Sequence, residues 1–385
     1  MTAVPDALGL VATLARTALD AEEGLPVGPV PLDGVDLGGL FEVAQRHRVQ
    51  PLLRTHADVL GLPEELTGRL DAWHAMARRR TLLQSLETVR AWELLDRAGV
   101  GVLAVKGQPL AVQTAGRADA RGPGDVDLLV DPDQLVEAHR LLTAAGWRPR
   151  EGGQVEPGTW AWRHLTRWGN ALTYAGEAAD VDLHWRLDRM PDAHPPFGVL
   201  RARSERVTLG TSSVATLSRY DALRHLATHR EGWIWLRTLV DLRRLARAEA
   251  ALDGPLRPAA ALSLALARAT VGLPATVPVD VHRRLDDTPA PLLERVVRLH
   301  ADGVPTAHTA AYGGRDVRGR LGEISSMTDL RHAAVELVLP AGVVLPVRAR
   351  TAWTGVPRAL GLRAADLSRK LRRDGPCAPP PEPAA

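Results

Sequence analysis

Apolar residues in the first hundred positions recur at the three- and four-residue spacing of an amphipathic helix. The pattern is present in residues 1–24, continues over residues 37–100, and is clearest over residues 64–97, where Gly99 then supplies a stop. We therefore expect residues 1–98 to form a helical N-terminal module.

The spacing then changes to that of strands. Residues 100–105, VGVLAV, form a short apolar run typical of a buried strand, and a Lys-Gly pair and a polar, glycine-bearing loop follow it. Residues 125–130, DVDLLV, predict a second strand, after which an Asp-Pro pair opens a helix that ends near residue 145. The order predicted for this region is strand, loop, strand, helix.

Three further extended segments follow at hairpin spacing, which predicts a mixed sheet with an antiparallel portion. They are residues 159–165, 171–174 and 179–185. We place the sheet-forming unit in residues 99–190 and expect an α+β protein.

The remainder of the chain is expected to be mainly helical over residues 191–372. A Pro-rich link leads to an extended piece at residues 206–217 and then to helices at residues 220–229 and 233–247. Residues 373–385 form a Pro-rich tail that we expect to be disordered.

Composition excludes several classes of protein. With 45% apolar and 24% charged residues over 385 positions, the chain has the make-up of a soluble globular protein. A net charge of +3 is too dilute to predict a duplex nucleic-acid partner. The single cysteine, Cys377, excludes an internal disulfide and a cysteine zinc cluster. The N-terminus lacks an export-signal pattern, and residues 333–347 are too short to span a bilayer, so we expect a cytoplasmic protein with no membrane partner.

The candidate chemistry begins in the DVDLLV segment. Side chains alternate between the faces of a strand, so Asp125 and Asp127 project together while the intervening apolar residues face the core. Two anions this close repel each other, and a site that keeps both ionised usually binds a hard cation, most often magnesium.

A similar alternation at DVDLHW places Asp180, Asp182 and His184 on one face. If the two strands are neighbours, Asp125, Asp127 and Asp182 form a three-carboxylate cluster of the kind used in two-metal phosphoryl transfer. We regard Asp180 as a solvated residue at the strand end. For His184 we leave two interpretations open, a functional contact and a packed polar side chain.

Lysine is scarce in this chain, which draws attention to one position. Of the 48 basic residues only Lys106 and Lys370 are lysine. Lys370 lies in a basic run near the C-terminus, whereas Lys106 follows a predicted buried strand directly. A compact ammonium at that position suggests a specific role.

These segments together resemble the uncharacterised nucleotidyltransferase-like family of the polymerase-beta superfamily. The resemblance is carried by LAVKG, RGPGDVDLLV and DVDLHW, with a helical segment at residues 223–245, and covers roughly residues 37–250. It implies a nucleotidyltransferase-type mixed sheet flanked by helices and two magnesium ions. It also implies transfer of a nucleoside monophosphate from a nucleoside triphosphate, ATP by default, to a hydroxyl-type acceptor.

The resemblance also assigns roles. Asp125 and Asp127 match the metal-binding pair, and Asp182 matches the third carboxylate, which helps to bind the catalytic metal and draws the proton from the acceptor. Lys106 and Gly107 match the start of the loop that holds the phosphates.

One motif departs from the family pattern. Gln108 follows Gly107 where the superfamily usually has serine or glycine, so a hydroxyl contact to the triphosphate is missing. Arg121, which can offer a bidentate fork to a phosphate, is our candidate substitute.

Other polar and aromatic residues have simpler interpretations. His225 and His229 have zinc-ligand spacing but lack the adjacent glutamate of a metalloprotease motif, so we favour a structural role, such as docking their helix onto the sheet. Seven of the ten tryptophans fall between residues 147 and 235, and we favour an aromatic core over base stacking. We expect Trp160 and Trp162 to share a strand face.

Three hypotheses about function remain. The first is a nucleotidyltransferase acting on a small molecule, a sugar or a protein side chain. The second is a catalytically silent binding or scaffold protein with the same fold in a biosynthetic pathway. The third is a toxin-like enzyme that modifies a protein or tRNA by the same chemistry.

Overall fold

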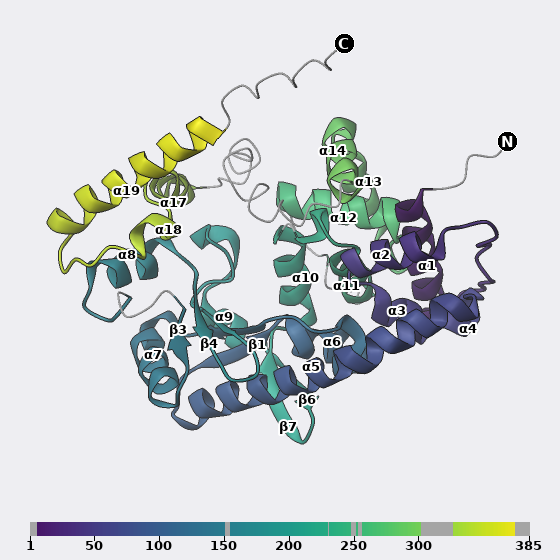
Figure 1. The fold of residues 1–385 in the computed structure, drawn as a ribbon, viewed down its shortest axis with the longest axis horizontal. Helices are drawn as coiled ribbons and strands as arrows, with labels where there is room; N and C mark the ends of the chain where they lie inside the picture. Colours follow the sequence, from purple (N-terminus) through teal and green to yellow (C-terminus); the bar gives the residue numbers. More distant parts are fainter. Residues whose placement is uncertain are drawn as a thin grey trace, which may run out of the picture.

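The computed structural model describes residues 6–150, 155–229, 231–247, 252, 256–301 and 326–373 (Figure 1). It shows an α+β protein in which helices flank a mixed five-stranded sheet, so the expected fold class is confirmed. The Pro-rich tail expected to be disordered lies outside the described residues except for Arg373, which ends the last helix.

The sheet has the strand order β1-β2-β5-β4-β3. Only β2 and β5 run parallel; the other neighbouring pairs are antiparallel. The strands that carry the two acidic motifs are therefore adjacent. The strand bounds are β1 Val102–Val105, β2 Val126–Val130, β3 Arg148–Pro149, β4 Ala171–Ala175 and β5 Val181–His184.

One face of the sheet is packed against helices α5 (Glu64–Arg97) and α7 (Leu135–Ala144). The 34 residues of α5 span about 50 Å, and in Figure 1 this helix runs along the whole length of the sheet. Leu128 of β2 and Leu183 of β5 have no exposed surface. Because side chains alternate along a strand, the polar residues of the same strands lie on the opposite face.

The segment after β1 is a helix where we expected a loop. Helix α6 (Gly107–Ala115) begins directly after Lys106, and Leu110 and Ala111 on it are buried. The apolar pattern of this helix is incomplete, because the polar residues Gln113 and Thr114 are also buried. Gln113 donates a hydrogen bond to the Leu217 carbonyl at 2.8 Å, and the Thr114 hydroxyl donates one to the Leu110 carbonyl. The helix packs next to β1 and the β6–β7 hairpin.

The segment expected as a strand at residues 159–165 was predicted wrongly. It forms α8 (Trp160–Trp168), and the Thr159 side chain caps it by accepting a hydrogen bond from the Trp162 backbone N–H at 3.2 Å. Trp160 and Trp162 therefore do not share a strand face. Trp160 packs in a small cluster with Val344, Val347 and Ala359, whereas Trp162 belongs to the main core.

The extended piece at residues 206–217 is a hairpin of β6 (Glu205–Leu209) and β7 (Ser212–Thr216). Gly210, with φ +61°, lies in its turn, where a left-handed conformation favours glycine. The hairpin packs next to β1 and α6.

The N-terminal helices pack onto helices from the middle of the chain. Arg243 on α11 bonds Asp20 and Glu23, and Arg244 bonds Glu22, at 2.5–3.0 Å. The remaining helices of these layers are α1 Ala7–Glu22, α2 Leu37–Arg46, α3 Gln50–Thr55, α4 Ala57–Leu60, α10 Arg219–Thr228, α11 Leu236–Leu245, α12 Pro258–Thr270, α13 Val279–Asp286 and α14 Ala290–Ala301.

The last described helices form a separate group around α8 at one end of the molecule (Figure 1). They are α17 Met327–Val338, α18 Ala341–Val344 and α19 Ala352–Arg373. Within the described part of the chain, no helix combines the length and the apolar composition needed to cross a bilayer.

Removing apolar volume from β5 tests the packing of the buried face of the sheet. Leu183→Ala is expected to lower the free energy of unfolding by about 2–5 kcal/mol, because the leucine is fully buried and leaves a cavity. Leu86→Ala on α5, which truncates a side chain 58% exposed, is the matched control and is expected to change it by about 0.5 kcal/mol or less. Urea unfolding of both variants measures the difference; equal losses would contradict the packing described.

Candidate active site

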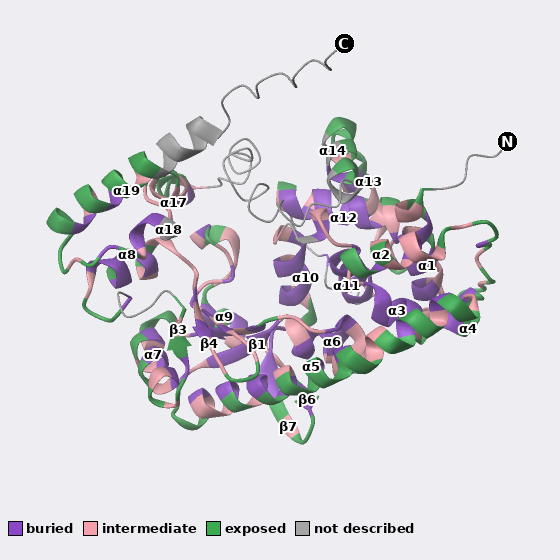
Figure 2. Cartoon of the chain, viewed as in Figure 1, coloured by how far each residue is buried: buried purple, intermediate pink, exposed green. Residues whose placement is uncertain are grey.

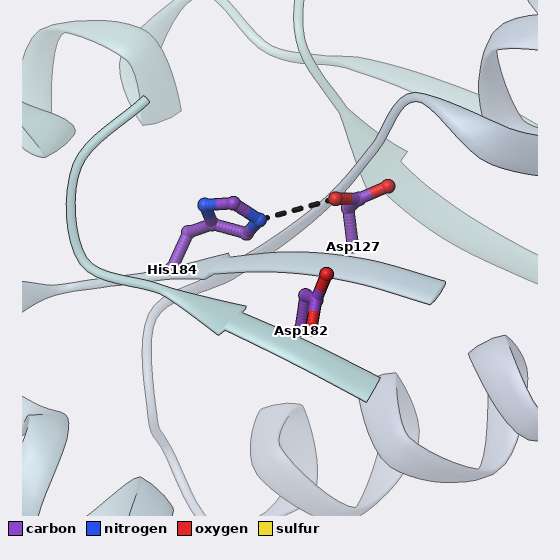
Figure 3. Close-up of side chains that lie close together, drawn as sticks. All are labelled: Asp127, Asp182 and His184. Atoms are coloured by element: carbon purple, nitrogen blue, oxygen red, sulfur yellow. Dashed lines mark hydrogen bonds and ion pairs between the residues drawn. The ribbon is translucent and has the colours of Figure 1, made fainter. Parts of the chain in front are cut away.

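The two central strands bring two carboxylates side by side. Asp127 of β2 and Asp182 of β5 are direct partners in the parallel register, so their side chains leave the same face of the sheet. His184, two residues further along β5, points its Nε2 at Asp127 Oδ1 at 3.1 Å (Figure 3). One ligand atom from each of the three lies within 4.8 Å of the others. We call these three residues the acidic triad.

Asp182 is held in an environment that disfavours its ionised form. Burial raises the pKa of its carboxyl above the usual value, and the neighbouring Asp127 carboxylate raises it further. The Thr173 hydroxyl on β4 donates a hydrogen bond to Asp182 Oδ1 at 2.6 Å, which fixes the carboxylate and partly offsets the burial. The carboxyl is thus both oriented and made more basic.

Asp125 lies apart from the acidic triad. It precedes β2 and is exposed, and it lines the same cleft, but no atom of it completes the close group around Asp127 and Asp182. The cluster expected from three carboxylates is therefore realised by two carboxylates and the His184 imidazole. The alternation in DVDLHW carried the signal for His184, and the strand register brings its imidazole to Asp127; a functional role for it stays a prediction.

Lys106 and Gly107 form a tight corner between β1 and α6. Lys106 has φ +55°, one of two non-glycine residues with positive φ among those described, and Gly107 has φ +43°. A Cβ on Gly107 would lie 3.2 Å from the Asp125 carbonyl oxygen, so the corner sits directly against the start of β2. A backbone in such a strained conformation persists only where the surrounding structure enforces it, and such strain is common at functional sites.

Helix α10 docks onto this corner through a histidine. Lys106 Nζ lies 2.8 Å from His229 Nε2. His225, one turn earlier, packs its ring against that of His229 at a centroid distance of 5.3 Å, and burial lowers its pKa well below 6.5, with Lys106 adding to the effect. His225 is therefore neutral at pH 7. These contacts agree with the docking role favoured for the pair, although His229 also lines the cleft, which spacing alone did not reveal.

Gln108, the residue that departs from the family's loop pattern, has a structural contact in the protein. Its side chain is buried and donates from Nε2 to Gln84 Oε1 on α5 at 3.1 Å. The same Gln84 oxygen accepts from the Gly124 backbone N–H at 3.0 Å, and Gln84 Nε2 donates to the Gly124 carbonyl. Gln108 thus positions the segment before β2 and does not line the cleft.

Arg121, at the end of a 3₁₀ turn (Ala118–Arg121), is engaged within the protein. Its Nε donates to Asp241 Oδ2 on α11 at 2.7 Å, and the two side chains are 4% and 0% exposed. Its Nη1 donates to the Gly107 carbonyl at 3.3 Å. The structure therefore gives Arg121 a role in holding the Gly107 corner, and a phosphate contact from it stays a prediction.

A cleft of about 560 Å³ joins these groups. All six residues singled out from the sequence line it, and they meet here from the start of α6, the 3₁₀ turn, β2 with the residue before it, and β5. Three arginines and two acidic residues from the surrounding helices and loops also line the cleft: Arg48, Arg189, Arg237, Asp188 and Glu336. Trp235 lines the cleft with the Arg48 guanidinium 4.2 Å from its ring centroid, whereas Trp147, Trp162 and Trp185 are buried in the core, as favoured for most of this group.

The acidic triad fits a divalent cation. Its donors are two carboxylates and an imidazole, a set that suits magnesium through oxygen and manganese or zinc through both atom types. His184 Nδ1 is buried without a hydrogen-bond partner, while Nε2 faces Asp127. A cation between Asp127 and Asp182 would also relieve the repulsion of the paired carboxylates.

The acidic triad and the Lys106-Gly107 corner line one cleft beside the parallel pair of strands β2 and β5. A family model described as an uncharacterised nucleotidyltransferase matches residues 33–273, well over half of the chain. The chain belongs to this family, which confirms the resemblance drawn from the motifs. No curated protein matched the chain.

Neutralising Asp182 is expected to stabilise the metal-free protein at neutral pH. Its folded pKa lies above the unfolded value of 3.8, so ionisation costs the folded state free energy as the pH rises through these values. Asp182→Asn keeps an acceptor for Thr173 and should melt at a higher temperature than the parent at pH 7 with chelator present. The difference should vanish below about pH 3.8.

The control for this measurement is Asp180→Asn. Asp180 starts the same segment but pairs with the exposed Arg150 at 2.7 Å, so its loss should change stability by about 1 kcal/mol or less. A gain for Asp182→Asn that persists unchanged at low pH would contradict the assignment.

The buried pair of Arg121 and Asp241 gives a second test. Asp241→Ala leaves a buried guanidinium without its counter-charge and is expected to cost about 3–5 kcal/mol, measured by urea unfolding. Arg121→Met combined with Asp241→Leu removes both charges and should recover most of that loss. A double variant no more stable than the single one would show that the pair is not the stabilising unit.

Proposed function

We propose that this protein is a metal-dependent nucleotidyltransferase. It transfers a nucleoside monophosphate from a nucleoside triphosphate, ATP by default, to a hydroxyl on a small molecule, a sugar or a protein side chain, and releases pyrophosphate. The observation that carries the proposal is the pairing of Asp127 with Asp182 across β2 and β5, at the edge of a cleft that also holds the Lys106-Gly107 corner.

The metal-binding residues are Asp127, Asp182 and His184, and Asp125 is the candidate ligand for a second ion. Each offers an oxygen or nitrogen donor towards the same cleft. When bound, divalent cations neutralise charge on the triphosphate and polarise the phosphorus that is attacked. We expect magnesium at these ligands, and the imidazole also makes them suited to manganese.

The triphosphate is held by the corner after β1. The N-terminus of α6 carries backbone N–H groups without partners in the helix, and its dipole favours an anion there. Lys106 adds an ammonium at the same point, anchored by His229. Arg121 supports this segment by donating a hydrogen bond to the Gly107 carbonyl.

The acceptor hydroxyl oxygen attacks the α-phosphorus, and the bond from that phosphorus to the oxygen bridging to the β-phosphate breaks. The leaving group is pyrophosphate, and the hydroxyl proton passes to the Asp182 carboxylate. A carboxylate with a raised pKa accepts a proton more readily than one in water, and Thr173 keeps it oriented.

Binding and turnover of the full-length protein test this proposal. Calorimetry with ATP and Mg²⁺ or Mn²⁺ should detect binding, and pyrophosphate release should be measurable across a panel of hydroxyl-bearing acceptors. Asp127→Asn and Asp182→Asn should each lower the rate by about 100-fold or more, because each removes an anionic metal ligand and the second also removes the proton acceptor. Asp180→Asn is the control and should retain the parent rate.

The rival function is a nucleotide-binding protein without turnover. Gln108 favours this rival, because its side chain is buried and offers no hydroxyl where the family usually contacts the phosphate. Binding of a metal-bound triphosphate without pyrophosphate release, for any triphosphate and acceptor, would support this rival. Growth arrest on expression that is lost in Asp127→Asn would instead favour the toxin-like enzyme.

A further inference from the structure

A second strained and cationic residue borders the cleft. Arg48 lies between α2 and α3 with φ +58°, and the other non-glycine residue with positive φ in the described part of the chain is Lys106. Both residues line the same cleft. A left-handed conformation costs an arginine free energy that its surroundings must offset, and such strain concentrates at functional sites. The strain in this chain thus falls on two cations beside one cleft.

One indole ring holds two guanidinium groups at this place. The Arg48 guanidinium carbon lies 4.2 Å from the Trp235 ring centroid, and that of Arg237 lies 6.0 Å from it. All three residues line the cleft, and we call them the arginine corner. A cation–π contact orients a guanidinium without removing its charge. Two positive charges beside one ring repel each other, so the corner favours an anionic ligand.

The fold fixes the arginine corner from behind. The His47 carbonyl accepts a hydrogen bond from the Arg237 backbone N–H at 3.2 Å, and His47 Nδ1 accepts one from the Leu236 N–H at 3.4 Å. Helix α11, which carries Arg237, is buried over its whole length (Figure 2). Arg237 itself is only 8% exposed. A ligand that reaches it leaves bulk water, where the attraction between opposite charges is stronger.

Helix α11 also joins the arginine corner to the Lys106-Gly107 corner. Arg237 precedes Asp241 by four residues, so the two side chains lie on the same face of α11, one turn apart. Asp241 binds Arg121, and Arg121 donates to the Gly107 carbonyl at 3.3 Å. The arginine corner is therefore next to the segment that holds the triphosphate in the proposed function.

The direction of the proposed reaction points the leaving group to this side of the cleft. In-line transfer places the attacking and the leaving oxygen on opposite sides of the α-phosphorus. In the proposed function Asp182 on β5 accepts the proton of the attacking hydroxyl, so that oxygen lies over β5. Because the strand order is β1-β2-β5, the leaving group extends over β2 towards β1 and the corner that follows it.

We propose that Arg48 and Arg237, positioned by Trp235, bind the β- and γ-phosphates of the nucleoside triphosphate and the pyrophosphate that leaves. The identity of this ligand rests on the proposed function, whereas binding of a linear polyphosphate at the arginine corner does not require turnover. A planar guanidinium donates two parallel hydrogen bonds to a phosphate, which an ammonium cannot do. A nucleoside monophosphate lacks both terminal phosphates and does not reach the arginines.

Calorimetry of the full-length protein with inorganic tripolyphosphate tests the inference without turnover. A chelator keeps metal ions away, so that the probe reports on the basic groups. The parent protein should bind tripolyphosphate, and Arg48→Gln and Arg237→Gln should each weaken binding about tenfold or more, the value of one hydrogen bond to a charged group. ATP should lose affinity by the same factor, whereas the affinity for AMP should not change.

Further variants separate binding from folding. Arg48→Gly suits a backbone at φ +58°, so it should lose tripolyphosphate binding with a melting temperature at least as high as that of Arg48→Gln. Trp235→Ala should weaken binding about fivefold, because both guanidinium groups lose their aromatic contact, and Trp235→Phe should recover most of the loss.

The matched control is Arg189→Gln. Arg189 lines the same cleft, but it follows β5 and pairs with Glu336 of α17, on the side away from the arginine corner. This variant should bind tripolyphosphate as the parent does. Circular dichroism checks that each variant is folded.

Several results would overturn the inference. They are unchanged tripolyphosphate binding in Arg48→Gln and Arg237→Gln, an equal loss in Arg189→Gln, an AMP affinity that falls as far as the ATP affinity, and no tripolyphosphate binding by the parent. The proposed function would stand in each case if pyrophosphate release is found. Conversely, polyphosphate binding that depends on Arg48, without pyrophosphate release, would support the inference and count against turnover.

Discussion

The site depends on one constraint, the parallel register that sets Asp127 beside Asp182. Two carboxylates at this separation repel each other, and the fold holds them there because Leu128 and Leu183, on the opposite face, are buried in the hydrophobic core. The apolar packing on one face therefore fixes the geometry of the charged groups on the other. A shift of one residue in either strand would turn that strand's carboxylate into the core, so the hydrophobic pattern itself protects the site.

Around this pair, the remaining polar groups act mainly as supports. Thr173 orients Asp182, Gln108 and Gln84 hold the segment that leads into β2, and Arg121 with Asp241 braces the Gly107 corner from the helical layer. Each support reaches the site from a different element of the chain.

The strands at residues 100–105, 125–130 and 179–185 could be predicted because apolar residues alternate with acids or form short buried runs there. The segment at 159–165 was predicted wrongly, since WAW mimics strand alternation, and the residues that cover Trp160 lie more than 180 residues further along the chain. His184 was undecided from the sequence because only the register with β2 brings it to Asp127. The buried pairing of Arg121 depends on Asp241, 120 residues away, which no local pattern reveals.

The ion pairs between α1 and α11 have a consequence for shortened forms of the chain. The family match begins at residue 33, which invites removal of everything before it. Arg243 and Arg244 are nearly inaccessible to water, and their carboxylate partners Asp20, Glu22 and Glu23 all lie in the part that would be lost. A trimmed protein would lose these counter-charges together with the buried apolar face of α1, so we expect the minimal unit that folds to extend beyond the segment by which its relatives are recognised.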